Sequence, residues 1–386
     1  DNVTIEPAGD LWGKDTFCTD EQMKERLGPS CETSCIGVAG ERLVPISCIG
    51  HDGENARMSG RCGFGAVMGS KKLKAVAVIG NMETEIADPK RLMAQQKKMV
   101  PIIVEKTKGM HLLGTAGGTA AAEKMGDFPV QNWRRGNWPD AEKITGQVMA
   151  DTILTKNYYC ASCPIGCGRD VEIKSGRWAG VKGAGPEYET LGLMGGSCLV
   201  NDLEAITYAA DLCNRHGVDT IEAGSAVAMA MECFEKGFLS PDELDGISAE
   251  WGSAEALVAL TEKICMAEGA GKLLGLGVAG MAKKIPGAES FAIHVKGLTL
   301  PAHDPRCFNT MAVGYATSNR GACHLASSAY FFEKTAVMPE FGYEKPRARY
   351  TEGGEGLLNF HAQNLMGLMD SLKMCKFPIA MTTISD

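Results

Sequence analysis

The sequence has no apolar run long enough to cross a membrane and no excess of basic side chains. No window approaches the roughly 18 uninterrupted apolar residues that a transmembrane helix needs. The 39 lysines and arginines are outnumbered by 47 aspartates and glutamates, which gives a formal net charge of −8 and argues against nucleic-acid binding. Hydrophobic residues make up 45% of the chain and charged residues 22%, which excludes a disordered protein. We therefore expect a folded protein with neither a membrane span nor a nucleic-acid partner.

A signal peptide, an initiator methionine and internal repeats of 20–50 residues are also missing. Because the sequence starts in the middle of a pattern, we expect it to be part of a longer protein. The 15 cysteines and 47 glycines among 386 residues are both high counts. In a large chain without a leader, so many cysteines indicate a reducing cytoplasm, with some thiols committed to metal.

The pattern along the chain changes from strand-like to helical, which predicts an α+β fold. The first 80 residues are mostly β, with short apolar runs at 43–49 and 75–79 between glycine-rich turns. Helices are expected at about 88–106, 202–216, 220–236, from 240 onward, 252–268, 271–284 and 356–372. This pattern predicts an N-terminal β-rich domain over residues 1–83, a helical domain over 84–293 and part of a second helical domain over 294–386.

The most informative string is Cys160-Ala-Ser-Cys163-Pro-Ile-Gly-Cys167. Three thiolates at these spacings can bind one face of a [4Fe–4S] cluster, whose fourth ligand often lies elsewhere in the chain. Zinc and plain structural thiols are the alternatives, although no second CxxC or histidine pair follows at the usual distance. Cys375 follows a predicted helix end and is the best distant candidate for a fourth ligand. The remaining cysteines include Cys213, Cys233 and Cys265, which are expected to be small core residues.

A glycine-rich segment and three polar strings are further site candidates. The segment 60–71 does not fit the Walker pattern, because Lys71 follows Ser70, and it lacks the third glycine of GxGxxG. It is either a turn between strands or a loop whose backbone amides and Arg61 contact an anion. The strings GPEYET, HDPR and SNRGACH carry carboxylates, arginines and histidines, but a lone histidine is more often structural than catalytic.

Taken together, these strings resemble the tungsten-dependent aldehyde:ferredoxin oxidoreductase family. The most specific pieces are GRCGFGAVMGSKKLKAVAV, CASCPIGC, GPEYET, HDPR, YATSNRGACH and DSLKMCKF. The resemblance covers nearly the whole chain, and members of the family are longer at both ends. It implies that the N-terminal β-rich domain binds the tungstopterin and that a [4Fe–4S] cluster lies beside it.

The resemblance also implies roles for individual residues. The cluster ligands would be Cys160, Cys163, Cys167 and Cys375, and the groups near the metal would be His324 with either Glu187 or Glu189. Arg61 and the backbone of Cys62 and Gly63 match the stretch that holds the pterin phosphates and their Mg²⁺. Further cofactor contacts match Asn214, Asp219, Arg320, Asp370 and Lys376. Two positions depart from the family pattern, because Asn214 replaces an aspartate and Lys373 replaces a glycine.

The activity implied is oxidation of an aldehyde to a carboxylic acid, with electrons passing through the cluster to ferredoxin or an iron–sulfur subunit. An oligomeric, oxygen-sensitive enzyme of an anaerobe is expected. The alternative within the resemblance is the catalytic subunit of a tungsten-containing benzoyl-CoA reductase, which acts on an aromatic CoA thioester. A non-catalytic electron carrier that binds only the cluster is the alternative from another class.

Overall fold

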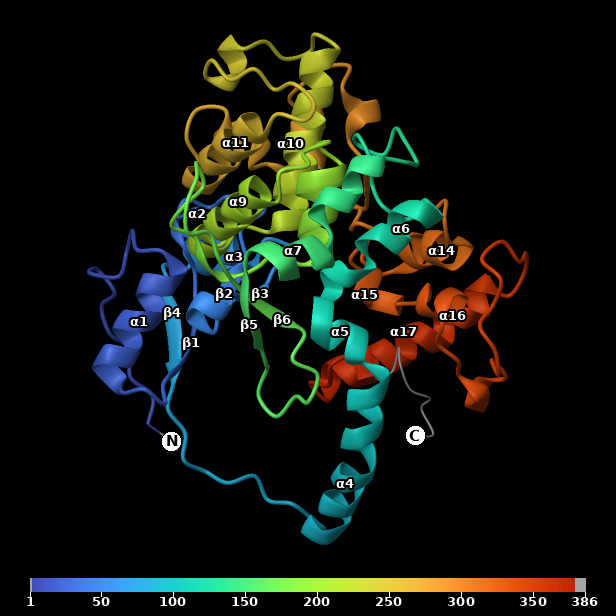
Figure 1. Ribbon diagram of the computed structural model, residues 1–386. Coiled ribbons are helices and arrows are strands. Elements are labelled where there is room, and N and C mark those ends of the chain that lie inside the picture. Colours follow the sequence, from blue (N-terminus) through green and yellow to red (C-terminus); the bar gives the residue numbers. More distant parts are fainter. Residues whose placement is uncertain (1, 379–386) are drawn as a thin grey trace.

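The first 80 residues contain a four-stranded antiparallel sheet, but more of them lie in helices than in strands, which corrects the expectation of a mostly β region. The computed structural model describes residues 2–378 (Figure 1). Its first sheet has the strand order β3-β2-β1-β4, with bounds Glu32–Cys35 (β1), Ile49–His51 (β2), Arg57–Ser59 (β3) and Ala75–Val78 (β4). Ser34 of β1 lies opposite His51 of β2 on one side and Val76 of β4 on the other. The helices around it are α1 (Thr16–Leu27), α2 (Val38–Glu41) and α3 (Phe64–Ser70).

Two local expectations for this region are corrected. The apolar run 43–49 is mostly turn rather than strand, and Leu43 itself has a left-handed backbone with φ 59°. The segment 60–71 is not a simple turn between strands, because its second half forms α3. The first run buries Val44 and Ile46 without forming a strand, whereas the buried residues of α3 are Gly65 and Gly69, a difference that periodicity alone does not reveal.

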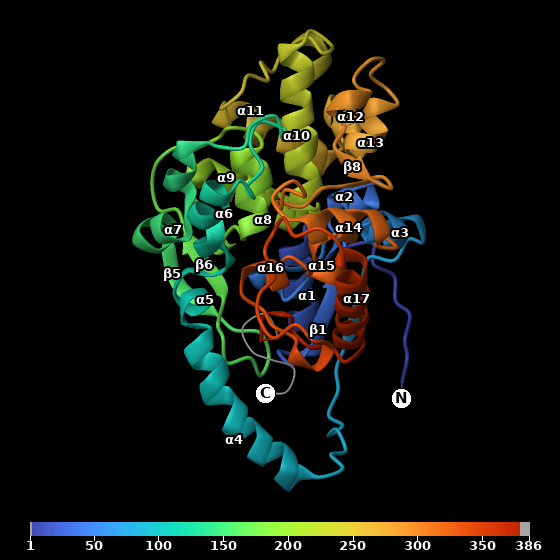
Figure 2. The same ribbon diagram turned by 90° about the vertical axis from the view of Figure 1, so that its right-hand side faces the viewer.

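Helix α4 (Pro89–Lys106) stands away from the rest of the molecule in both views (Figures 1 and 2). It begins where expected, because Asp88 accepts a hydrogen bond from the backbone N–H of Arg91 at 2.9 Å and Pro89 occupies the first turn. No residue of α4 is buried. The chain then returns to the body through α5 (Lys108–Leu113), η2 (Thr115–Gly118), α6 (Thr119–Met125), η3 (Pro139–Ile144) and α7 (Gly146–Thr152).

A second sheet, which the sequence reading missed, lies inside the region expected to be helical. It pairs β5 (Leu154–Tyr158), β6 (Gly168–Glu172) and β7 (Lys182–Ala184) in antiparallel order. The chain leaves this sheet into α8 (Tyr188–Thr190), which runs on into the fully buried π-helical turn η4 (Leu191–Gly196). This buried turn fixes the direction of the GPEYET string relative to the core.

The main core surrounds α10, most of whose residues are buried. Its helices are α9 (Leu203–His216), α10 (Thr220–Glu235), α11 (Ala254–Met266), α12 (Gly271–Leu274) and α13 (Gly277–Ala282). Asp202 and Asp219 cap α9 and α10 through hydrogen bonds from backbone N–H groups. Two expectations are wrong: the segment after Ser240 forms only a short 3₁₀ turn, η5 (Asp242–Leu244), and 271–284 divides into two helices at Gly277, whose φ is +70°.

The C-terminal third is helical, with one small hairpin. Its elements are η6 (Glu289–Phe291), β8 (His294–Val295), β9 (Leu298–Thr299), α14 (Asn309–Thr317), α15 (His324–Ser327), α16 (Phe331–Lys334), η7 (Pro339–Phe341) and α17 (Glu355–Ser371). Helix α17 packs on α14 and α15 (Figure 2), and its bounds match the expected last helix closely. Residue 1 and residues 379–386, at the ends of the expected first and third domains, lie outside the described part. Over residues 2–378 no helix combines the length and apolarity that crossing a membrane requires.

Candidate functional site

Three of the cysteines lie in the loop that connects β5 to β6. The strands place Tyr158 opposite Gly168, so the nine residues 159–167 form the tip of a hairpin. Cys160 is exposed, whereas Cys163 and Cys167 are partly buried. A Cβ on Gly166, whose φ is +62°, would lie 2.4 Å from the ring of Tyr159, so only glycine fits this turn. The loop therefore presents three thiols at one end of the second sheet.

Cys375 lies near these three thiols, although it is more than 200 residues away in the sequence. Burial raises the pKa of the Cys375 thiol, and interaction with Cys163 and Cys160 adds to the rise. Burial likewise raises the pKa of Cys167 to about 12, with further contributions from Glu187 and Cys375. All fifteen cysteines are described, and each is a free thiol. The structure thus places Cys375 close enough to interact with the hairpin thiols.

The four thiols Cys160, Cys163, Cys167 and Cys375 are the candidate metal-binding donors. Within residues 2–378, no three histidine, cysteine or acidic side chains are grouped closely enough to hold a single metal ion. A tetrahedral zinc site needs sulfur atoms about 2.3 Å from one centre. A cluster of several irons bridges thiolates that stand farther apart. Four thiols are a donor set that a [4Fe–4S] cluster and a zinc ion can each use.

Glu187 faces the cysteine loop. Its Oε1 lies 3.3 Å from Nη1 of Arg57, and its Oε2 accepts a hydrogen bond from the Thr115 hydroxyl. Arg57 also lies over the ring of Tyr158, 5.0 Å from its centroid. Burial alone would lower the pKa of Arg57, but Glu187, Cys160 and Cys167 raise it overall. Arg57, which the sequence reading did not select, is therefore the cation that links Glu187 to the thiols.

Glu189 points to a different place and meets two histidines. Its Oε1 lies 3.4 Å from Nε2 of His324 and 3.6 Å from Nε2 of His303. Its Oε2 accepts a 2.6 Å hydrogen bond from the backbone N–H of Ala302. Burial raises the pKa of Glu189, and His303, Ala302 and Arg61 offset only part of that rise. The sequence left open which glutamate accompanies His324, and the structure brings Glu189 to it.

His324 is held neutral by its surroundings. Burial lowers its pKa well below the usual value, and its neighbours His303 and Arg61 lower it further. Its Nδ1 and the Oε1 of Glu189 are buried atoms without a hydrogen-bond partner. Two orphaned polar atoms on adjacent side chains are costly unless another polar group meets them. The pair therefore has the character of a site that receives a ligand.

Arg61 is turned into the protein. Its two terminal nitrogens donate to the carbonyl oxygens of Ala322 and Thr299 at 2.7 and 2.6 Å, and one lies 3.2 Å from Oε1 of Glu222. Its Nε lies 3.5 Å from Oδ2 of Asp219. Neither Nε nor that Oδ2 has a hydrogen-bond partner. Thus Arg61 and Asp219, which the sequence placed at the cofactor, do lie together, while most of the guanidinium is already bound by protein groups.

Glu222, an acid that the sequence did not single out, lies against the buried Arg61. Glu222 follows the α10 cap by one helical turn, and its Oε1 accepts a 3.1 Å hydrogen bond from the backbone N–H of Thr299. Burial raises its pKa to about 7, although Arg61 lowers it in part.

Next to Arg61, Cys62 and Gly63 take left-handed backbones with φ of 78° and 72°. A Cβ on Gly63 would lie 2.3 Å from the carbonyl oxygen of Pro45, so this residue must be glycine.

The other predicted cofactor contacts fall at helix ends. Lys376 donates to the carbonyl oxygen of Leu325 at 2.9 Å and pairs with Asp370 at 3.0 Å. Arg320 is exposed and donates to Sγ of Cys323 at 2.7 Å. Asn214 lies in the last turn of α9, and its carbonyl oxygen accepts a hydrogen bond from the Thr16 hydroxyl. Lys376 and Asp370 therefore lie at the cysteine and histidine groups, whereas Asn214 contacts the first helix.

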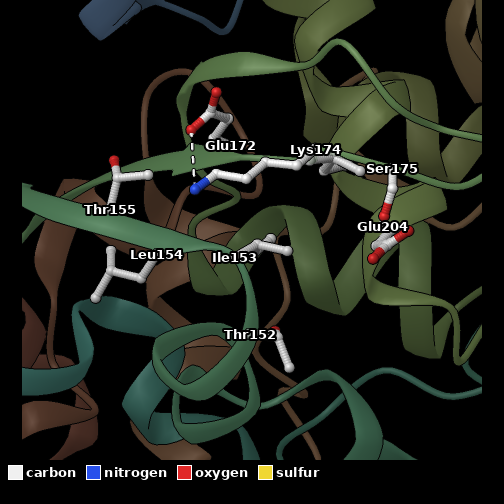
Figure 3. Close-up of a pocket in the computed structure, with 9 residues that line it drawn as sticks. Thr152, Ile153, Leu154, Thr155, Glu172, Lys174, Ser175 and Glu204 are labelled. Atoms are coloured by element: carbon white, nitrogen blue, oxygen red, sulfur yellow. Dashed lines mark ion pairs between the residues drawn. The ribbon is translucent and has the colours of Figure 1, made fainter.

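Figure 3 shows a pocket that is separate from these groups. It has a volume of about 210 Å³ and is lined by residues 152–155, 172–175 and 204. These residues lie at the open end of the β5–β6 hairpin, opposite the tip that carries the cysteines. Lys174 and Glu172 pair across it at 3.7 Å. None of the residues predicted from the sequence lines this pocket.

The sequence reading missed residues that only the fold brings to the site. Arg57 and Glu222 lie in ordinary strand and helix patterns, so no local signal marks them. Asp127 and Lys334 lie behind His303 and are separated from it by 176 and 31 positions. His303 itself stands in the HDPR string, which the sequence marked as unusual without assigning the histidine a role.

Comparison with known proteins gives a consistent family. The family model described as aldehyde ferredoxin oxidoreductase, domains 2 and 3, matches residues 92–386. The model for the N-terminal domain of aldehyde ferredoxin oxidoreductase matches residues 1–80. Tungsten-containing aldehyde ferredoxin oxidoreductases of Thermococcus kodakarensis and Pyrococcus furiosus are each 36% identical to this chain over 386 residues, covering 98% of it. The chain spans 61% of the length of these relatives.

More distant relatives have names that describe other activities. The aliphatic sulfonate oxidoreductase, WOR-like subunit, of Pyrococcus furiosus is 29% identical over 317 residues, which covers 80% of this chain and 49% of that protein. The solved active-site complex BamBC of benzoyl coenzyme A reductase with 1,5-dienoyl-CoA superposes with a TM-score of 0.79. Its sequence identity is 22%, and the match covers 99% of this chain and 64% of that one. This likeness shows a shared fold.

Proposed function

The chain belongs to the aldehyde ferredoxin oxidoreductase family, and we propose that it forms much of a tungsten-pterin enzyme that oxidises an aldehyde to a carboxylic acid. Electrons would leave through a [4Fe–4S] cluster to ferredoxin or an iron–sulfur subunit. One observation carries the proposal: Glu187 and Glu189, two residues apart, face different partners. Glu187 meets Arg57 beside the thiols, and Glu189 meets His324. A proton-handling pair thus lies next to a candidate electron-transfer centre.

The cluster would be held by Cys160, Cys163, Cys167 and Cys375. Their support is the hairpin that presents three thiols and the interaction of Cys375 with two of them. Burial keeps the pKa of Cys167 raised, although the positive charge of Arg57 lowers that pKa in part. The donor set therefore fits the proposed group.

The pterin and its Mg²⁺-bridged phosphates would be held near the buried Arg61 and the backbone of Cys62 and Gly63. The unpartnered Nε of Arg61 and Oδ2 of Asp219 are polar atoms that a ligand could satisfy. Additional contacts are proposed for Asn214, Arg320, Asp370 and Lys376. When bound, the tungsten centre would accept the two electrons of the aldehyde, which the cluster would pass on one at a time.

The side chains of this chain would manage the proton and the substrate. Aldehyde oxidation consumes water and releases two protons with two electrons, so the buried site needs a base. Glu189 is the carboxylate within reach of both imidazoles, and burial brings its pKa toward the working range. His324, neutral and 3.4 Å away, can orient the substrate oxygen or share the proton.

The experiment that tests this function is elemental analysis of the protein purified without oxygen, combined with two activity assays. We expect about one tungsten and about four irons per chain, as one cluster requires, together with aldehyde oxidation linked to a viologen dye. Reduction of an aromatic CoA thioester without aldehyde oxidation would favour the ring-reducing alternative. Iron without tungsten or molybdenum would demote the chain to an electron carrier, and zinc alone would overturn the cluster.

A further inference from the structure

His303 lies beside Glu189 in a tightly fixed position that the proposed chemistry has not yet used. The side chain is 8% exposed. Its ring is stacked on Tyr188, with centroids 5.0 Å apart, and packs at 4.4 Å against Tyr330. The Tyr315 hydroxyl donates to its carbonyl oxygen at 2.9 Å. The imidazole therefore cannot rotate away from the groups that it faces.

Asp127 fixes which nitrogen of His303 carries a proton. Its Oδ2 lies 2.9 Å from Nδ1 of His303 and 2.9 Å from Nζ of Lys334. Burial would raise the pKa of Asp127, but His303 and Lys334 outweigh it, and the pKa is lowered overall. Since an ionised carboxylate only accepts hydrogen bonds, Nδ1 must be the donor. Nε2 is then the nitrogen that faces Oε1 of Glu189.

The two histidines at Glu189 differ in the partner of their Nδ1 atom. Nδ1 of His324 has no hydrogen-bond partner, whereas Nδ1 of His303 has a buried carboxylate. A carboxylate behind an imidazole orients the ring and stabilises the imidazolium that forms when the far nitrogen accepts a proton. His303 is therefore the neighbour of Glu189 that is built to accept a proton.

We propose that His303, oriented by Asp127, is a positioning residue. It takes the proton from Glu189 and so returns Glu189 to its carboxylate form. The inference rests on the proposed function, in which an aldehyde and water give an acid, two protons and two electrons. In the step itself, the O–H bond at Glu189 Oε1 breaks and an N–H bond forms at Nε2 of His303. A neutral acid and a neutral imidazole become a carboxylate and an imidazolium, and the new positive charge faces Asp127.

The charged and titratable groups that face Glu189 come from several elements. They are His303, His324, Arg61, Asp127 and the phenols of Tyr188, Tyr315 and Tyr330. The phenols have pKa values well above the usual value because of burial and so stay neutral. Arg61 keeps its positive charge throughout, so the two imidazoles are the groups that can exchange a proton with Glu189.

The test is an infrared pH titration of the Glu189 carboxyl in the holoenzyme, with the band identified by its loss in E189Q. In H303F the carboxyl loses its proton acceptor but Asp127 keeps Lys334, so the fold should persist. We expect the midpoint of the Glu189 band to rise by about one pH unit or more, the size expected for the loss of a neighbouring opposite charge. H303Q, whose amide can still donate to Oε1, should give a smaller rise. Y315F removes the hydrogen bond to the His303 carbonyl oxygen and a phenol that stays neutral, so it changes no charge at Glu189 and should leave the midpoint in place.

Each outcome decides the inference. In H303F the acidic limb of the pH profile of kcat/KM should move to higher pH, together with the titration midpoint of the Glu189 band. An unchanged midpoint in both H303F and H303Q, or an equal change in Y315F, would overturn the role of His303. If the wild-type protein oxidises no aldehyde while the band still moves in H303F, the proposed function fails but the proton transfer between Glu189 and His303 stands.

Discussion

Lys376 donates a hydrogen bond from its Nζ to the carbonyl oxygen of Leu325 at a distance of 2.9 Å. Leu325 directly follows His324, and Lys376 directly follows Cys375. One hydrogen bond therefore joins the loop of a proposed cluster ligand to the helix of a proposed proton-handling residue. The bond is reinforced by the ion pair between Lys376 and Asp370.

Replacing Lys376 with methionine tests this connection. The methionine keeps much of the apolar length but removes the donor, which leaves a carbonyl oxygen without its partner at a cost of about 1–3 kcal/mol. We expect a lower iron content per chain and an activity reduced at least severalfold. K71M, which changes an exposed lysine of α3's C-terminal end, is the matched control. Full iron content and activity in K376M would show that the hydrogen bond is incidental.

Substituting Glu189 and substituting Glu187 should have different effects. Removing a positioned general base typically costs a factor of about 10²–10⁴, so E189Q should lose aldehyde oxidation by at least about 100-fold while keeping its metals. E187Q should retain more turnover and instead alter the cluster, because Glu187 meets Arg57 and lies near Cys167. Steady-state kinetics and the reduction potential of the cluster are the measurements. An equal loss of turnover in both variants, with unchanged potentials, would refute the division of roles.

Cys375 should be required for the cluster. We expect C375S to contain fewer irons and to lose the electron paramagnetic signal of a reduced four-iron cluster, because the fourth thiolate is missing. Cys18 is a partly exposed cysteine on α1, so C18S is the matched control and should resemble the wild type. If C375S keeps four irons and an unaltered signal, another residue must supply the fourth ligand.

Glu222 should make the stability of the protein depend on pH. Its folded pKa is raised to about 7, so between its unfolded value and pH 7 the folded state binds more protons than the unfolded state. The free energy of unfolding therefore falls as pH rises through about 4.5–7, by roughly 3 kcal/mol at most from this group. E222Q should lack this decline, which denaturant unfolding at several pH values would measure. Parallel pH dependence of the two proteins would contradict the raised pKa.

Lys373 occupies a position that suits glycine. It follows the C-terminus of α17 with φ +58°, and the next backbone N–H, that of Met374, bonds back to Met369 at 2.9 Å, as in a helix end closed by a left-handed residue. We expect K373G to raise the free energy of unfolding by up to about 1 kcal/mol, because a side chain in this conformation costs about 1–2 kcal/mol and glycine's extra chain entropy offsets part of that gain. A lower midpoint of thermal unfolding in K373G would be the opposite result.

The sequence predicts those features that local rules determine. Capping residues such as Asp88, Asp202 and Asp219 mark the starts of α4, α9 and α10 correctly. The β5–β7 sheet was missed because its short strands carry charged side chains and surround the cysteine string, which does not alternate. The choice of Glu189 over Glu187 depends on the path of α8 and η4, which no local pattern specifies.

The same holds for the groups behind the site. Asp127, His303 and Lys334 come together from three segments, and only tertiary packing reveals their contact. The sequence marks Arg61 as an anion-binding side chain, but in the structure two backbone carbonyl oxygens and the buried Glu222 carboxylate take up its terminal nitrogens. A sequence shows which residues are capable of a role, whereas burial decides whether they are free to perform it.

The burial of Arg61 with Asp219 and Glu222 also bears on how sequences of this fold can diverge. Losing the arginine alone would leave two buried carboxylates without a cation, at a cost of about 3–5 kcal/mol, and losing either acid would leave the cation undercompensated. Few single changes at these three positions can be tolerated, so the three residues should change together among related sequences. A chimaera that joins the first sheet of one relative to α10 of another should fold only when both parents carry the same charge set.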